Sequence, residues 1–318
     1  MLLIVAFILF LLTLFLYLFL SLYSKYAVLS ILWLVKFLGG FESKTVKPSN
    51  SNQTFSYMER GHRSKDRNTV VFIHGFTATK ESFADVSKYL STKYHIVSLD
   101  LPGHGMTSGD TPDDVGIAYF VEEVKKFLDD IGLGDTKIHL IGESMGGHIV
   151  GYFAAMYPNS IASVTMVCPH GIYFNELEEP KEEFLRTGKH YLVPEDYAGV
   201  KNMMLYLSHK QMFVPAFVLK GMLELRMERN NFYKKLLNNL LLPPNDRLLE
   251  NSMKQIISPS MLMWGKLDNV LDVSCVDVIK KNVPNLKKCV LLENTGHVLT
   301  YETPKEVATS LDQLINSL

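Results

Sequence analysis

A serine between two glycines, in Gly142-Glu143-Ser144-Met145-Gly146, constrains the fold of this chain more than any other feature. The apolar run Lys137–Ile141 before it predicts a buried strand, and the residues from Gly147 to Met156 predict a packed helix. A strand that turns directly into a helix strains the backbone, and a Cβ on either glycine would collide with neighbouring backbone. Because such a turn exposes the hydroxyl, Ser144 is predicted to be a nucleophile.

The partners that a nucleophilic serine needs lie downstream. A pentapeptide of this kind also occurs in glycine-rich loops, so a general base and an orienting carboxylate must accompany it. Asp268 follows a predicted strand at Pro259–Trp264, and His297 follows another at Lys287–Leu292. The order serine, aspartate, histidine is that of the α/β-hydrolase architecture. Asp268 is therefore the predicted acid and His297 the predicted base.

Other polar residues compete for these roles. Asp100 ends a strand in the same region and Asp272 lies one helical turn beyond Asp268, but Asp268 comes directly after the penultimate strand. Asp100 is predicted to fix the loop that carries Gly103 and Gly105. The histidines His74 and His104 are predicted to brace loops, and His148 to pack within the helix after the serine.

An oxyanion hole completes the predicted site, because the tetrahedral intermediate carries a negative oxygen that needs fixed donors. One donor is the backbone N–H of Met145, the residue after the nucleophile, where the positive end of the helix dipole adds to it. The other is the backbone N–H of Phe76, in the loop His74-Gly75-Phe76 after the predicted strand at residues 69–73.

The spacing of strands predicts an α/β fold with a mostly parallel sheet covered by helices on both faces. The predicted strands are Thr69–His74, His95–Leu99, Lys137–Ile141, Ile161–Val167, Pro259–Trp264 and Lys287–Leu292, with an antiparallel edge strand at Thr54–Arg60. Residues 171–244 contain no strand pattern and predict a helical cap over the nucleophile. Its apolar side chains either line an acyl pocket or pack the cap onto the sheet. The candidates are Met203, Met204, Leu205, Phe213, Phe217, Leu219, Met222 and Leu223.

These motifs together resemble the α/β-hydrolase superfamily, from about Thr54 to the C-terminus. With the apolar N-terminus and Val167-Cys168-Pro169-His170-Gly171, the chain most closely resembles the membrane-anchored monoacylglycerol lipases of the α/β-hydrolase-domain group numbered six. The resemblance implies hydrolysis of monoacylglycerol to glycerol and a fatty acid. A lysophospholipase, another carboxylesterase or a carbon-carbon hydrolase are alternatives within enzymes, and a membrane scaffold on the same fold is the alternative outside catalysis.

The N-terminus predicts a membrane anchor at residues 1–24, because no charged side chain occurs there. A helix of this length reaches roughly 35 Å, enough for the ~30 Å hydrocarbon core of a bilayer. A cleaved signal peptide is disfavoured, since the run is too long and lacks a basic start. Residues 25–52 form a predicted juxtamembrane segment in which Tyr26–Leu38 either lies at the lipid interface or packs on the hydrolase domain, residues 53–318.

Flanking charge predicts the orientation. Lys25, Lys36, Lys44 and Lys47 follow the span and only the α-amino group precedes it, which places the catalytic domain in the cytosol. The sequon at Asn52 would suit the opposite side and is predicted to be unused.

Several classes of partner are not indicated. The histidines are scattered and the three cysteines lack metal-ligand spacing, so no metal is predicted. No phosphate-binding glycine motif occurs, so no cofactor is predicted. A net charge of −1 implies no nucleic-acid partner. The predicted partners are a lipid substrate and the bilayer.

Overall fold

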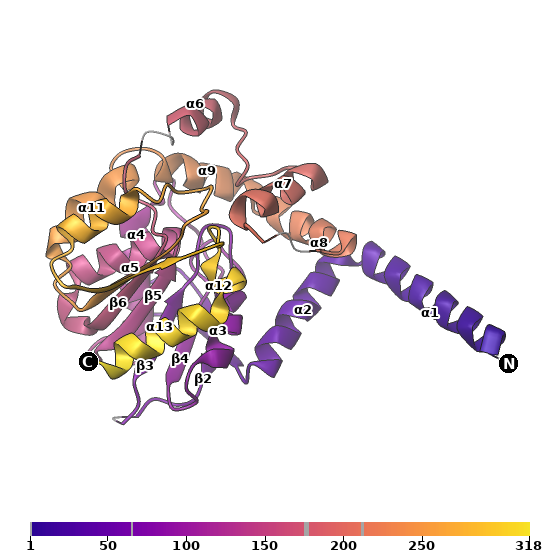
Figure 1. The fold of residues 1–318 in the computed structure, drawn as a ribbon, viewed down its shortest axis with the longest axis horizontal. Coiled ribbons are helices and arrows are strands. Elements are labelled where there is room, and N and C mark those ends of the chain that lie inside the picture. Colours follow the sequence, from indigo (N-terminus) through magenta and orange to yellow (C-terminus); the bar gives the residue numbers. More distant parts are fainter. Residues whose placement is uncertain (1, 65, 175–177, 211–212) are drawn as a thin grey trace.

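The computed structural model describes residues 2–64, 66–174, 178–210 and 213–318, and these form a twisted sheet covered by helices on both faces (Figure 1). The sheet of this described part has the order β1-β2-β4-β3-β5-β6-β7-β8. Its strands are β1 (Glu42–Val46), β2 (Phe55–Arg60), β3 (Thr69–Ile73), β4 (His95–Leu99), β5 (Ile138–Glu143), β6 (Ile161–Val167), β7 (Ser260–Gly265) and β8 (Leu286–Leu292). From β4 to β8 the neighbouring strands are parallel, which confirms the predicted fold class.

The antiparallel end of the sheet differs in one respect from the prediction. β2 pairs antiparallel with β4 as expected, but β1 pairs on its other side, so β2 is not the edge. β1 lies inside the segment predicted to be juxtamembrane, and the hydrolase sheet therefore begins at Glu42. Four of its five side chains are exposed, so the strand has no apolar pattern that the sequence could reveal.

Helices bury the central strands from both sides. Every residue of β3, β4, β5 and β7 is buried, which explains why these strands are mostly apolar and do not alternate with exposed polar residues. On one face α3 (Ala84–Tyr89) packs against α13 (Pro304–Asn316), and on the other α5 (Met145–Met156) packs against α4 (Ile117–Asp130) and α10 (Leu248–Ser252). α11 (Cys275–Asn282) connects β7 to β8.

The described part of the predicted cap insertion, residues 171–244, consists of helices joined by loops and contains no strand. Its helices are α6 (Glu178–Thr187), α7 (Tyr197–Leu207), α8 (Ala216–Met227) and α9 (Asn230–Leu240). They lie beyond the carboxyl ends of the parallel strands, together with the short helix α12 (Leu299–Glu302) (Figure 1). The cap therefore covers the edge at which catalytic residues were predicted.

Two helices precede the sheet. α1 (Leu2–Leu22) projects away from the body, and its segment Ile4–Leu22 is long and apolar enough to cross a membrane, with none of it buried (Figure 1). α2 (Ser24–Leu38) turns back and packs against α8, with Ser24, Ala27 and Val28 buried. Packing on the hydrolase domain, one of the two predicted alternatives, is thus observed for one face of α2. Six of its large side chains are exposed: Tyr26, Ile31, Trp33, Leu34, Phe37 and Leu38.

Candidate active site

Ser144 lies at a strained turn between β5 and α5. Its backbone has φ 59° and ψ −118°, a conformation that residues other than glycine rarely adopt. The two glycines are required by close packing, because a Cβ on Gly142 would lie 2.1 Å from the carbonyl oxygen of Gly146, and one on Gly146 would lie 2.3 Å from that of Ile73. Ser144 N–H donates to the Val167 carbonyl at 2.9 Å, which ties the turn to β6.

Asp268 and His297 come together at the ends of β7 and β8. His297 Nδ1 donates to Asp268 Oδ2 at 2.7 Å, while Asp268 Oδ1 accepts from the N–H groups of Val270 and Leu271 at 2.8 and 3.0 Å. Burial lowers the pKa of His297, but the charge of Asp268, its hydrogen bond and the charge of Glu143 outweigh burial, so the pKa is raised above its ordinary value. The carboxylate orients the ring and leaves Nε2 for chemistry.

Two links hold the His297 loop against the turn that carries Ser144. Glu143, directly before the serine, accepts from Thr300 N at 3.1 Å and Thr300 Oγ1 at 2.8 Å. Cys168, directly after β6, donates from Sγ to the His297 carbonyl at 3.1 Å. The serine, histidine and aspartate thus belong to segments that are bonded to one another at one edge of the sheet.

The predicted oxyanion donors lie beside the serine. Met145 is the first residue of α5, so its N–H has no intrahelical acceptor. In the described part of the chain, neither that N–H nor the N–H of Phe76 donates to another protein group. The loop of Phe76 touches the nucleophile, because a Cβ on Gly75 would lie 3.3 Å from Ser144 Cβ. Both N–H groups therefore remain available near the serine.

The competing acids have other partners. Asp100 is buried and accepts from Lys80 N at 2.8 Å, Lys80 Nζ at 2.7 Å and Met106 N at 2.8 Å. A Cβ on Gly105 would lie 2.2 Å from the Asp100 carboxyl carbon, so Asp100 holds this loop as predicted. Asp272 accepts from Ser274 N at 2.7 Å, at the start of α11.

The other histidines brace the surroundings. His74 accepts from Leu101 N at Nε2, 3.0 Å away, and His104 Nδ1 lies 3.0 Å from the Pro102 carbonyl, as the loop-bracing prediction requires. His148 does more than pack, because its Nδ1 lies 3.2 Å from Nδ1 of His170. Burial lowers the pKa of His170 to about 4, so this pair is neutral near pH 7.

Glu143 and Cys168 were not singled out as site residues from the sequence. The signal for Glu143 was an acid at the end of a buried strand, which needs a partner. Burial raises the pKa of the Glu143 carboxyl. Nothing in the sequence pointed to Cys168. Its unusual backbone φ of 34° appears only in the structure. Cys168 Sγ also lies within 4.8 Å of ligand atoms of Asp268 and His297, but the histidine and aspartate are bonded to each other.

Five of the eight predicted acyl-pocket residues gather in one apolar cluster between α7 and α8: Met203, Met204, Leu219, Met222 and Leu223. Met203 is buried with Val200 and Leu219 between α7 and α8, and Met222 packs on the edge of this cluster. Phe217 lies at the α1 side of the cap, its ring 6.5 Å from that of Tyr17, and Phe213 is 92% exposed. These side chains mostly pack helices together, because helices of a small cap need their apolar faces for one another. Phe213 is exposed in this structure, and the acyl-pocket role of these residues stays a prediction.

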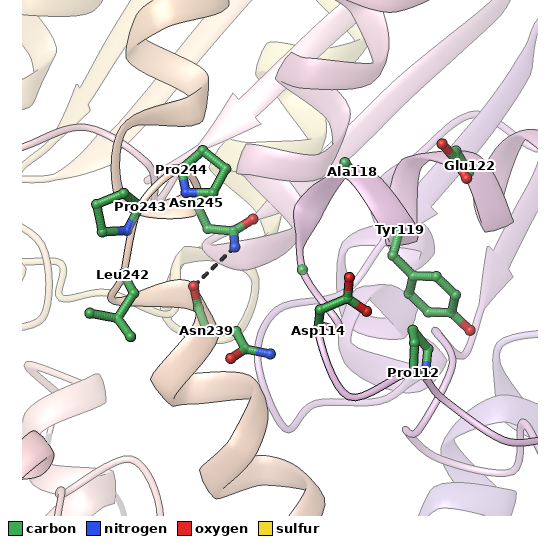
Figure 2. A pocket seen from close by; sticks show the side chains of 11 residues that line it. Pro112, Asp114, Ala118, Tyr119, Glu122, Asn239, Leu242, Pro243, Pro244 and Asn245 are labelled. Atoms are coloured by element: carbon green, nitrogen blue, oxygen red, sulfur yellow. Dashed lines mark hydrogen bonds between the residues drawn. The ribbon is translucent and has the colours of Figure 1, made fainter.

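A cavity of about 530 Å³ lies between the start of α4 and the end of α9 (Figure 2). Prolines and polar side chains surround it, and Asn245 Nδ2 donates to the Asn239 carbonyl across one side at 3.0 Å. Its lining contains none of the candidate catalytic residues, so this cavity is not the acyl site.

Known proteins resemble this chain in sequence. A family model described as the alpha/beta hydrolase fold matches residues 68–192. Monoacylglycerol lipase ABHD6 of Rattus norvegicus is 34% identical over 80% of this chain and 77% of its own length. The human protein of that name is 32% identical over 83% and 80%, respectively. Monoacylglycerol lipase abhd6-A of Xenopus laevis is 31% identical over 85% and 81%.

Solved structures also resemble the fold. A bacterial membrane phospholipase A, described as a virulence factor, superposes with a TM-score of 0.80 at 29% identity and covers 98% of both chains. A putative lipase of Acinetobacter baumannii has a TM-score of 0.80 at 26% identity, over 92% of this chain and 97% of its own. Both similarities extend over nearly the whole chain.

Proposed function

Because this chain belongs to the α/β-hydrolase family of the ABHD6 monoacylglycerol lipases, we propose that it is a membrane-anchored serine hydrolase that cleaves monoacylglycerol to glycerol and a fatty acid. Relatives of that name supply the substrate class. The observation that carries the chemistry is the Asp268–His297 hydrogen bond, in a loop that Thr300 bonds to the residue before Ser144.

The reaction has two halves. Ser144 Oγ attacks the ester carbonyl carbon while His297 Nε2 takes the hydroxyl proton, and the new oxyanion accepts from the N–H groups of Phe76 and Met145. The carbon–oxygen bond to glycerol then breaks, and His297 returns the proton to the glycerol oxygen. In the second half His297 takes a proton from water, the hydroxide attacks the acyl-enzyme, and Ser144 regains its proton as the fatty acid leaves.

Asp268 supports both halves by charge. It fixes the Nδ1–H tautomer, so that Nε2 is the basic atom, and it stabilises the imidazolium that forms when the proton moves. The residues named for these steps act without a cofactor. A non-catalytic scaffold would have no chemical use for this hydrogen-bonded pair beside a strained serine.

Membrane association rests on α1 and on the exposed face of α2. With α1 as a single span, the lysines at positions 25, 36, 44 and 47 favour the cytosol for the catalytic domain. Trp33, Tyr26 and Lys36 are residue types that lie at the headgroup level. A one-chain lipid could then pass from the bilayer to the cap without crossing bulk water.

The test is the Ser144→Ala variant of the full-length protein in detergent. Removing the nucleophile should lower kcat for monoacylglycerol to background, a loss on the order of 10⁶-fold if the serine acts as in other triad enzymes. Fluorophosphonate labelling of the variant should also disappear. Undiminished release of fatty acid by the purified, folded variant would refute the assignment.

One alternative substrate has specific support. The membrane phospholipase A superposes on 98% of this chain, whereas the sequence matches to the ABHD6 relatives cover 80 to 85% of it. A lysophospholipid carries the same single acyl ester as a monoacylglycerol. A comparison of kcat/KM for the two lipids with matched acyl chains in mixed micelles separates them, and a ratio in favour of the lysophospholipid would replace the proposed substrate while keeping the triad.

A further inference from the structure

Besides Asp268 and Glu143, a third buried carboxylate, Glu302, bonds to the loop of the catalytic histidine. It is the last residue of α12, five positions after His297, and only 7% of it is exposed. Glu302 Oε1 accepts from Gly296 N at 2.9 Å, next to the histidine, and from His209 N at 3.2 Å. Its Oε2 accepts from Lys210 N at 2.9 Å. One carboxylate therefore binds the histidine loop and the cap together.

The two segments that Glu302 joins also touch directly. The Leu207 carbonyl, at the end of α7, accepts from His297 N at 2.9 Å and from Val298 N at 3.2 Å. Lys210 Nζ donates to the Glu302 carbonyl at 2.7 Å. A Cβ on Gly296 would lie 2.7 Å from His209 N, so only glycine allows this approach. The turn after α7 is thus built onto the backbone of the histidine itself.

We propose that Glu302 is a positioning residue that places His297 by clamping its loop to the turn after α7 of the cap. This inference rests on the proposed function, since it assigns a role relative to His297 as the base. An ionised carboxylate offers only acceptors, and here three backbone N–H groups converge on it. Within the described residues, none of these three N–H groups donates to a backbone carbonyl, so Glu302 is the acceptor that satisfies them.

The clamp makes the position of the histidine depend on how the cap is seated. α7 packs on α8 through Met203 and Leu219, and α8 in turn packs on α2 at Gly221, where a Cβ would lie 2.3 Å from the Ser24 carbonyl. A continuous set of contacts therefore runs from the N-terminal helices through two cap helices to the backbone N–H of His297. Movement of the cap away from the sheet would pull on the loop that holds the base.

The test replaces Glu302 by glutamine in the full-length protein in detergent. An amide has nearly the same volume, but its NH₂ must face at least one of the N–H groups, so the clamp loses an acceptor and gains a repulsive contact. We expect kcat for monoacylglycerol to fall by about 10- to 100-fold, the effect of a displacement near 1 Å, with KM changed less than about 3-fold, because ground-state substrate binding is left intact. The matched control is Glu293→Gln, an exposed acid of the same loop that pairs with Lys266.

A second readout separates positioning from simple stability. If the clamp sets the geometry of His297 against Asp268, the acid limb of the kcat profile should move to lower pH in Glu302→Gln and stay in place in Glu293→Gln. A kcat equal to that of the control would overturn the proposal. So would a loss that matches the unfolded fraction measured by circular dichroism, with the acid limb unmoved.

Two further variants keep the test decisive. If Glu302→Gln does not fold, Lys210→Met probes the clamp from the cap side by removing the bond to the Glu302 carbonyl. It should lower kcat several-fold and shift the same limb, and wild-type values for both would overturn the proposal. Ser144→Ala separates the two levels of inference: an active Ser144→Ala refutes the proposed function, whereas an inactive one beside a fully active Glu302→Gln refutes the clamp alone.

Discussion

At the scale of single residues, His297 combines deep burial with a charged neighbour. Burial favours the neutral ring, yet the pKa is raised because Asp268 and Glu143 favour the charged one. Protonated His297 thus stabilises the folded state below the ordinary histidine pKa, and this contribution is lost as pH rises through the raised pKa. Catalysis has the opposite pH dependence, since the base must be neutral, so activity should appear as pH rises through that raised value.

The Asp268→Asn variant tests this balance. Without the carboxylate the His297 tautomer is no longer fixed, so kcat should fall by on the order of 10⁴-fold. Burial then lowers the pKa of His297, so the acid limb of the residual activity should move to lower pH. Asp272→Asn is the control, because within the described residues that carboxylate accepts from Ser274 N and is not bonded to His297. A kcat profile measured from pH 4 to 9 checks both, and an Asp268→Asn limb that stays in place would contradict the assigned role.

The triad candidates could be predicted because each follows a strand whose apolar run is readable, and parallel strands bring their carboxyl ends to one edge. The partners of Glu143, Cys168 and Glu302 could not. Each bonds a residue more than 90 positions away or in another loop, and such pairings depend on how the cap and the histidine loop meet in space. Residue type alone showed only that a buried acid needs a donor.

At the scale of elements, the sequence did not predict the contact between α8 and the N-terminal helices α1 and α2, here called the joint. Glu224 accepts from Ser24 Oγ at 2.9 Å and from Lys25 N at 3.0 Å, so a cap side chain satisfies the first turn of α2. Lys220 Nζ donates to the Ser21 carbonyl at 3.0 Å, at the end of α1. The sequence predicted a helical cap, but not that one of its helices would bond to the N-terminal helices.

We expect Glu224→Gln to loosen this joint. The negative carboxylate stabilises the positive N-terminal end of α2, and its loss should destabilise that end by about 0.5–1 kcal/mol. Amides in the first turn of α2 should therefore exchange with deuterium about 2- to 5-fold faster. Hydrogen-exchange mass spectrometry of the detergent-solubilised protein measures this. Glu122→Gln, on the exposed side of α4, should leave α2 unchanged, and equal exchange in the two variants would argue against Glu224 as the cap of α2.

At the scale of the whole molecule, α1 as a membrane span and the four lysines at positions 25, 36, 44 and 47 predict a catalytic domain in the cytosol. Asn52 provides a native reporter of this topology, because its side chain is exposed and would be accessible to glycosylation if the domain faced the lumen. We expect no mobility shift on deglycosylation of protein from eukaryotic membranes. A sequon on an N-terminal extension should be modified in the same cells, and a glycan at Asn52 would reverse the orientation.

The attachment of the cap to α1 and α2 also determines which measure of substrate abundance controls the rate of hydrolysis. With α1 in a bilayer, the cap helices stay beside the lipid surface, and the enzyme meets its substrate by lateral diffusion in two dimensions. The relevant abundance is then the mole fraction of monoacylglycerol among its neighbours. Dilution with inert phospholipid would slow turnover even when the amount of substrate per volume is constant, so the enzyme would respond to membrane composition rather than to bulk concentration.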